Sequence, residues 1–127
     1  MPRRIIVTDQ APAAIGPYSQ AIDTGNFVFT SGVIPVNPDT GVIPEGIEAQ
    51  TEQVMENLIA LLKASGVNQR NVVKTTVFIK NMDDFSEVNE VYSFYFSEQA
   101  PARSCVEVAR LPKDVLIEVE AIAMKQS

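Results

Sequence analysis

The 127-residue sequence contains no histidine, no tryptophan and only one cysteine, Cys105. Without histidine the protein has no Ser-His or Cys-His nucleophile pair, no imidazole metal ligand and no side chain that ordinarily titrates near neutral pH. A single cysteine excludes an internal disulfide and any zinc site built on cysteine spacing, which favours a reducing compartment. Any chemistry must therefore depend on carboxylates, Arg, Lys, Tyr or backbone groups, and we expect neither a metal nor a cofactor.

Long hydrophobic runs are also missing, and basic residues are few. No stretch reaches the roughly 18 consecutive apolar residues of a membrane span, and residues 1–20 hold no apolar run long enough for a signal peptide. We therefore expect a cytoplasmic protein with no membrane partner. Ten Lys and Arg against sixteen Asp and Glu give a formal charge of −6. That balance argues against nucleic acid as a partner, because phosphate binding needs a basic surface.

The rest of the composition is typical of one globular domain spanning residues 1–127. Hydrophobic residues make up 46% and charged residues 20%, and a chain of this length can bury a core without disulfides or a structural metal. Apolar residues recur at helical spacing over residues 46–65, and Gly66 follows where a left-handed C-terminal cap is expected. A second helix should follow a cap at Asn81, with an apolar stripe over residues 85–96 and Asn89 at its edge.

Four further segments have the pattern of β-strands. Residues 20–34 read as two short strands around a tight turn at residues 23–26, and residues 71–80 carry apolar groups on both faces, as a central strand does. Residues 103–109 and 115–124 form two more strands on either side of a turn. The predicted order is β-β-α-β-α-β-β, with an optional third strand before the first helix.

Two strand-helix-strand crossovers of one hand place both helices on the same face of a mixed sheet, which predicts a two-layer α+β fold. The other face of the sheet is then uncovered. Two helices cannot cover all of the apolar groups of the central strands, which are Val73, Val77, Ile79, Val119 and Ala121. We therefore predict that sheet faces pack between subunits.

Two side chains are the strongest candidates for chemistry. In strand geometry Arg103, Cys105 and Glu107 share one face, and Glu118 and Glu120 share a face of the last strand. Arginine is a natural receptor for a substrate carboxylate, because its planar guanidinium donates two parallel charge-assisted hydrogen bonds. The alternative is an ion pair between Arg103 and one of the glutamates. Glu118 could act as a general base, directly or through a water molecule, or it could simply face solvent.

Five other residues are weaker candidates for a binding pocket. Cys105 could be a nucleophile if a neighbouring guanidinium lowered its pKa, but no histidine can take its proton, and lone cysteines are often buried small hydrophobes. Tyr18, Ser31 and Asn89 lie beside turns or apolar stripes, where polar residues more often serve as local hydrogen-bonding groups. Gly32 indicates a β-bulge, which can be purely structural or can expose a backbone N–H to an anion.

Several stretches form a specific combination, and the most specific part is the Pro-Ala-Arg-Ser segment followed at this spacing by Ile-Glu. The stretches are Ala13-Ala14-Ile15-Gly16-Pro17-Tyr18-Ser19-Gln20, Thr30-Ser31-Gly32 with Ile34-Pro35, Val73-Lys74-Thr75-Thr76-Val77-Phe78, Val88-Asn89, and Pro101-Ala102-Arg103-Ser104 with Ile117-Glu118-Val119. Together they closely resemble the RidA/YjgF family over nearly the whole chain. The resemblance implies a chorismate-mutase-like α+β fold and a homotrimer with a central β-barrel and ligand sites between neighbouring subunits.

The resemblance also implies an activity. Members of this family hydrolyse reactive 2-imino or enamine acids made by pyridoxal-phosphate enzymes, such as 2-aminoacrylate/2-iminopropanoate and 2-iminobutanoate, to 2-oxo acids and ammonia. Transferred by position, Arg103 is the carboxylate clamp and Glu118 positions the water, and the pocket is lined by Tyr18, Ser31, Gly32, Asn89 and Cys105. Imines already hydrolyse in water, so holding the substrate and the water in a near-attack geometry could be enough.

The chain departs from the family pattern in two places, and two other functions stay open. Residues 97–100 are a short lead into Pro101, where close deaminase relatives often have a longer segment with an aromatic, and Val119 replaces the commoner Met or Ile. The first alternative function is a regulatory trimer that binds a small 2-oxo or 2-amino acid without turning it over. The second is ribonuclease or translation-inhibitor activity, against which the net charge and the lack of histidine argue.

Overall fold

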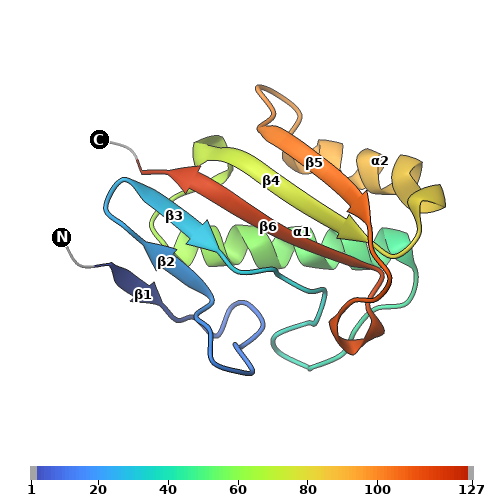
Figure 1. Cartoon of the computed structure of the whole chain (residues 1–127), viewed down its shortest axis with the longest axis horizontal. Coiled ribbons are helices and arrows are strands. Elements are labelled where there is room, and N and C mark those ends of the chain that lie inside the picture. Colours follow the sequence, from blue (N-terminus) through green and yellow to red (C-terminus); the bar gives the residue numbers. More distant parts are fainter. Residues whose placement is uncertain (1–2, 126–127) are drawn as a thin grey trace.

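A computed structural model of the chain describes residues 3–125 as one mixed sheet with two helices on the same face (Figure 1). The strand order is β1-β2-β3-β6-β4-β5, in which β4 and β5 pair in parallel and the other neighbours pair antiparallel. The two-layer α+β prediction is therefore confirmed. The elements are β1 (Arg4–Ile6), β2 (Ala21–Asp23), β3 (Phe27–Thr30), α1 (Ile47–Ala64), β4 (Val72–Ile79), α2 (Phe85–Tyr95), β5 (Ala102–Glu107) and β6 (Ile117–Met124), with 3-10 turns η1 (Gln69–Asn71), η2 (Met82–Asp84) and η3 (Pro112–Asp114).

The helices and the longer strands lie within a few residues of their predicted bounds. Asn81 caps the segment before α2 as expected, and its side chain accepts a hydrogen bond of 2.9 Å from the Asp83 N–H. The optional third strand is reduced to a single bridge between Val33 and Val119. Strand β1 was not predicted, because three residues are too few to show an alternating pattern. Over residues 3–125, neither helix is long and apolar enough to cross a membrane.

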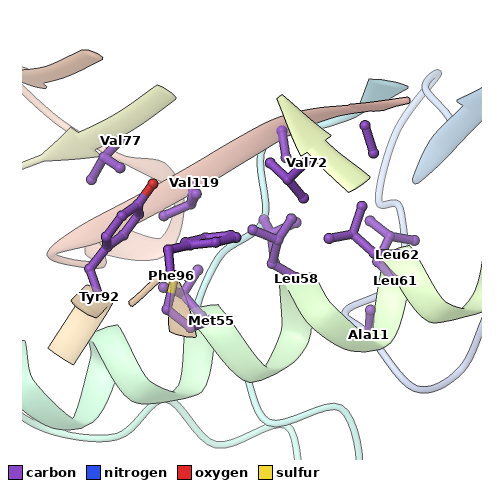
Figure 2. Packing of buried hydrophobic residues seen from close by; sticks show 14 of the residues in the cluster. Ala11, Met55, Leu58, Leu61, Leu62, Val72, Val77, Tyr92, Phe96 and Val119 are labelled. Carbon is purple, nitrogen blue, oxygen red and sulfur yellow. The ribbon is translucent and has the colours of Figure 1, made fainter. Parts of the chain in front are cut away.

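The core lies between the helices and the sheet (Figure 2). Met55, Leu58 and Leu62 of α1 are fully buried, and Tyr92 and Phe96 pack beside them. On the sheet side, the residues that face the helices are Val77, Ile79, Val119 and Ala121. At roughly 25 cal/mol per Å² of apolar surface removed from water, this layer is the main source of stability.

Two helices were predicted not to cover all five apolar residues named on the central strands, and only Val73 of the five is left on the surface. The other four are at most 2% exposed beneath the helices. The uncovered face exists, but other apolar side chains lie on it: Ile5, Phe27, Phe29, Val106 and Met124. Both faces of the central strands are apolar, so the sequence pattern alone could not say which set the helices cover.

A buried carboxylate joins β1 to the C-terminal end of β6. Asp23 of β2 accepts hydrogen bonds from Lys125 Nζ at 2.7 Å, Arg4 Nη2 at 3.1 Å and the Gly25 N–H at 2.8 Å. The bond from Lys125, followed by the other two, lowers the pKa of Asp23 to about 2, against the opposing effect of burial. Asp23 is therefore ionised at neutral pH and links β1 to the residue that follows β6.

Candidate functional site

Arg103 lies on β5, at the edge of the sheet, and its guanidinium rests against α2. Its Nη1 donates a hydrogen bond of 2.7 Å to Asn89 Oδ1. The guanidinium carbon lies 4.9 Å from the ring centroid of Tyr92 and 5.4 Å from that of Phe85, distances typical of cation–π contacts. Within residues 3–125 Arg103 takes part in no ion pair, so the predicted alternative, a pair with a glutamate, is absent from this part of the chain. Its charge is therefore available to a ligand carboxylate.

The sequence interpretation missed the two aromatic rings that support Arg103. Phe85, Asn89 and Tyr92 follow one another at i, i+4 and i+7, so they share one face of α2. Tyr92 is fixed in turn by a 2.7 Å hydrogen bond between its hydroxyl and Thr75 Oγ1. Burial raises the pKa of Tyr92, against the opposing effects of Thr75 and Arg103. The helical spacing around Asn89 was a usable signal, but these rings also belong to the apolar stripe and were assigned to the core.

Cys105 follows on the same face of β5 and is half-buried. Burial raises the pKa of its thiol, and the nearby positive charge of Arg103 only partly offsets that effect. The thiol therefore stays protonated at neutral pH, which is unfavourable for a nucleophile. We call Arg103, Asn89 and Cys105 the Arg103 cluster.

Glu118 lies on the opposite face of the sheet. It pairs with Phe78 of β4, which pairs on its other side with the exposed Val106 of β5, so all three point away from the helices. Glu118 is only partly exposed, and its pKa is raised, first by burial and second by the negative charge of Glu120. A carboxylate in such a setting is a better proton acceptor at neutral pH than one in water.

A β-bulge separates the end of β3 from the residues that follow it. The register pairs Phe29 with Ile122 and Val33 with Val119, so three intervening residues on one strand face two on the other. At the bulge the Thr30 hydroxyl accepts a 3.0 Å hydrogen bond from a backbone N–H of β6. The bulge predicted from the sequence is therefore present.

Gly32 leaves the bulge directly against the carboxylate of Glu118. A Cβ atom at position 32 would overlap that carboxylate. The other five glycines have positive φ angles, whereas Gly32 does not, so Gly32 is required for space rather than for backbone conformation. Over residues 3–125 its backbone N–H has no hydrogen-bond partner, which leaves a donor beside the carboxylate.

A cleft of about 810 Å³ opens beside Glu118. We call it the Glu118 cleft; four of the seven predicted site residues line it, namely Tyr18, Ser31, Gly32 and Glu118. The Tyr18 hydroxyl accepts a 3.3 Å hydrogen bond from the Ile15 N–H, and Ser31 Oγ donates one of 2.6 Å to the Ser19 carbonyl. The polar groups of both residues are thus held by neighbouring backbone at the wall of the cleft.

One chain does not bring the Arg103 cluster and the Glu118 cleft together. Arg103 pairs with Thr75, which is fully buried beneath the helices, whereas Glu118 pairs with Phe78 on the uncovered face. No residue of the Arg103 cluster lines the Glu118 cleft. The seven residues expected to form one site therefore form two groups on opposite faces of the sheet.

Comparison with known proteins finds many chains that are similar to this one in sequence and in structure. Residues 8–125 match the family model described as Endoribonuclease L-PSP. The chain is 55% identical to a RutC family protein of Pyrococcus abyssi, over 99% of this chain and 100% of that protein. It is 53% identical to the 2-iminobutanoate/2-iminopropanoate deaminase of Escherichia coli, over 97% and 98%. The crystal structure of Escherichia coli TdcF with bound serine matches with a TM-score of 0.94 at 49% identity, covering 97% of this chain and 99% of that one.

Proposed function

The chain belongs to the Endoribonuclease L-PSP family, which includes the RidA/YjgF proteins that its sequence resembles, and on that basis we propose that it is an imine deaminase. The proposed reaction is hydrolysis of 2-aminoacrylate/2-iminopropanoate and 2-iminobutanoate to 2-oxo acids and ammonia. The observation that carries the proposal is the half-buried Glu118 carboxylate, held against Gly32 at the wall of a ligand-sized cleft. The close similarity to the Escherichia coli deaminase supports the choice of substrate.

The site is proposed to be shared between two copies of the chain. A four-carbon imino acid is too small to reach both Arg103 and Glu118 when they lie on opposite faces of one sheet. A second copy that presents its Arg103 cluster at the Glu118 cleft removes this difficulty. The apolar side chains on the uncovered face support contact between copies, since exposed patches of this kind commonly mark interfaces. We propose the homotrimer with a central β-barrel that the family resemblance implies.

In the proposed mechanism the substrate carboxylate binds the Arg103 guanidinium, which Asn89 and the two aromatic rings hold in place. Glu118 positions a water molecule, and its carboxylate accepts a proton as the water oxygen attacks C2 of the imine. Glu118 returns this proton to the nitrogen, which gives a carbinolamine. The hydroxyl proton then passes to the amino nitrogen through Glu118, the C–N bond breaks, and ammonia leaves as the hydroxyl oxygen becomes the 2-oxo group. In this proposal each step uses only water and the side chains named above, and we propose no metal or cofactor.

The proposal is tested by generating 2-iminobutanoate with a threonine dehydratase and following the appearance of 2-oxobutanoate with and without this protein. We expect the protein to raise the rate of hydrolysis above the uncatalysed rate in proportion to its concentration. Binding of 2-oxobutanoate without acceleration would favour the second candidate, a regulatory trimer that binds small 2-oxo or 2-amino acids. That candidate is considered because the similar TdcF structure contains serine.

The name of the family model points to a third candidate, ribonuclease activity, and the charge of the site argues against it. The Glu118 cleft is lined by the carboxylates of Asp9, Glu118 and Glu120, and the whole chain has a net charge of −6. RNA binding depends on neutralising phosphates with Lys and Arg. Salt-sensitive RNA binding by this protein would reopen the ribonuclease hypothesis.

Replacing Gly32 by alanine tests the close approach to Glu118. The new methyl group must displace the carboxylate from its position, so we expect Gly32→Ala to lower the deamination rate at least roughly tenfold, a cost of about 1.4 kcal/mol in the barrier. Circular dichroism should show a folded protein. The comparison variant is Gly25→Ala, at a positive φ but with nothing near its Cβ; we expect it to lose stability and keep its rate. An unchanged rate in Gly32→Ala would contradict the role given to Glu118.

A further inference from the structure

The lining of the Glu118 cleft has an uneven charge. Asp9, Glu118 and Glu120 contribute carboxylates, and Lys113 contributes the only positive side chain among the residues that line it. The proposed substrate is itself an anion. Each carboxylate within about 4 Å of another negative charge costs on the order of 1 kcal/mol in water, and more where water is partly excluded. The Arg103 guanidinium of a second copy would supply one positive charge to the shared site, and Lys113 is the cation that this chain itself adds against the three carboxylates.

The backbone around Lys113 adopts an unfavourable conformation at the edge of the cleft. Lys113 and Asp114 have φ angles of 55° and 56°, so two successive non-glycine residues lie in the left-handed region. Each such residue costs about 1–2 kcal/mol. The turn is held by two hydrogen bonds from Arg110 to Asp114, at 2.8 and 3.3 Å, and by the Asp114 N–H bond to the Leu111 carbonyl at 3.0 Å. These hydrogen bonds thus hold the backbone of Lys113 in a left-handed conformation that a non-glycine residue rarely adopts.

The charge of Lys113 is not used within the described part of the chain. Its neighbour Asp114 pairs with Arg110, and no ion pair or side-chain hydrogen bond among residues 3–125 involves the Lys113 ammonium. The strained turn thus presents an exposed, unpaired cation at a cleft that three carboxylates also line, where its charge can act on a bound anion. Strained backbone of this kind is concentrated at functional sites.

We propose that Lys113 is a specificity residue of the deaminase site, which offsets the carboxylates of the Glu118 cleft and so favours anionic 2-imino acids over neutral imines. This inference rests on the proposed function for the identity of the ligand. Lys113 acts through its charge on binding, while Arg103 makes the directed contact with the substrate carboxylate. An arginine at this position should therefore serve almost as well as the lysine.

The test measures the dissociation constant of 2-oxobutanoate, the stable product, for the wild type and the Lys113→Gln and Lys113→Arg variants. The control is Lys63→Gln, which removes the same charge from an exposed position on α1 outside the cleft. We expect Lys113→Gln to bind roughly tenfold more weakly at low ionic strength, and Lys113→Arg and Lys63→Gln to bind like the wild type. The difference should shrink as the ionic strength rises from about 0.01 to 0.15 M, because the screening length falls from about 30 to 8 Å.

Turnover of 2-iminobutanoate by the same proteins separates this inference from the proposed function. If the wild type binds 2-oxobutanoate but does not accelerate hydrolysis, the proposed function fails, and the binding comparison still decides the role of Lys113. Equal affinity in the two glutamine variants would overturn the inference, as would a wild type that does not bind 2-oxobutanoate. An equal loss of affinity for a neutral ester of 2-oxobutanoate would also overturn it, because the residue would then act through structure rather than charge.

Discussion

The Arg103→Ala variant is expected to lose nearly all acceleration of 2-iminobutanoate hydrolysis. The guanidinium is the charged group that binds the substrate carboxylate in the proposed mechanism, and it already lies in place against Asn89 and the ring of Tyr92. Removing one partner of such a charge pair costs about 3 kcal/mol, which corresponds to a loss of roughly 100-fold in kcat/KM. The measurement is the coupled assay with threonine dehydratase, over a range of enzyme concentrations.

Two further variants make this result specific to Arg103. Arg70→Ala removes an exposed arginine from η1 that belongs neither to the Arg103 cluster nor to the lining of the Glu118 cleft, and we expect it to keep full activity. Arg103→Lys keeps the charge but loses the planar pair of donors, so it should fall between the wild type and the alanine variant. Full acceleration by a folded Arg103→Ala protein would show that this guanidinium does not bind the substrate.

Two inactive variants are expected to restore activity to each other when they assemble together. Arg103→Ala lacks the clamp, and Glu118→Gln lacks the base while keeping nearly the same side-chain volume. If each site takes Arg103 from one copy and Glu118 from its neighbour, random assembly of equal amounts restores about a quarter of the sites, since each residue is intact with a probability of about one half. The measurement is the deamination rate after the two proteins are unfolded, mixed and refolded, compared with each variant refolded alone.

The same experiment distinguishes the shared site from a site within one chain. A site built within a single copy would gain nothing from mixing, because every chain still lacks one residue. Mass spectrometry of the refolded sample establishes that mixed oligomers have formed. Mixed oligomers without recovered activity would contradict the shared site, even if the wild type is an active deaminase.

Most of the secondary structure could be predicted from local patterns. The apolar spacing over residues 46–65 corresponds to α1, and the stripe around Asn89 corresponds to α2. Asn81 caps the segment before α2, and Gly66 follows α1 with the positive φ expected of a left-handed C-terminal cap. Strand β1 could not be found in this way. Arg4–Ile6 pairs with β2, which is distant in the sequence, and its register with Asp23 and Ala21 exists only in the folded sheet.

The residues of the candidate site were identifiable one by one, but their arrangement was not. Arg103 and Glu118 could be chosen from residue chemistry and family resemblance, and the alternation of each strand says which of its neighbours share a face. Alternation within a strand does not predict which residues of two neighbouring strands lie on the same face of the sheet. The register places Val77 of β4 opposite both Cys105 and Val119, and this pairing puts Arg103 beneath the helices and Glu118 on the other side.

Sequence patterns were sufficient to predict the α+β class, the two helices, the family and the chemical groups available to the site. These features depend on composition and on patterns only a few residues long. Three features could be seen only in the folded chain: which sheet face the helices cover, how closely Gly32 approaches Glu118, and the raised pKa of Glu118, caused by burial and by the charge of Glu120. Each of these depends on distances between segments far apart in the chain, which are set only when the strands align and the core packs.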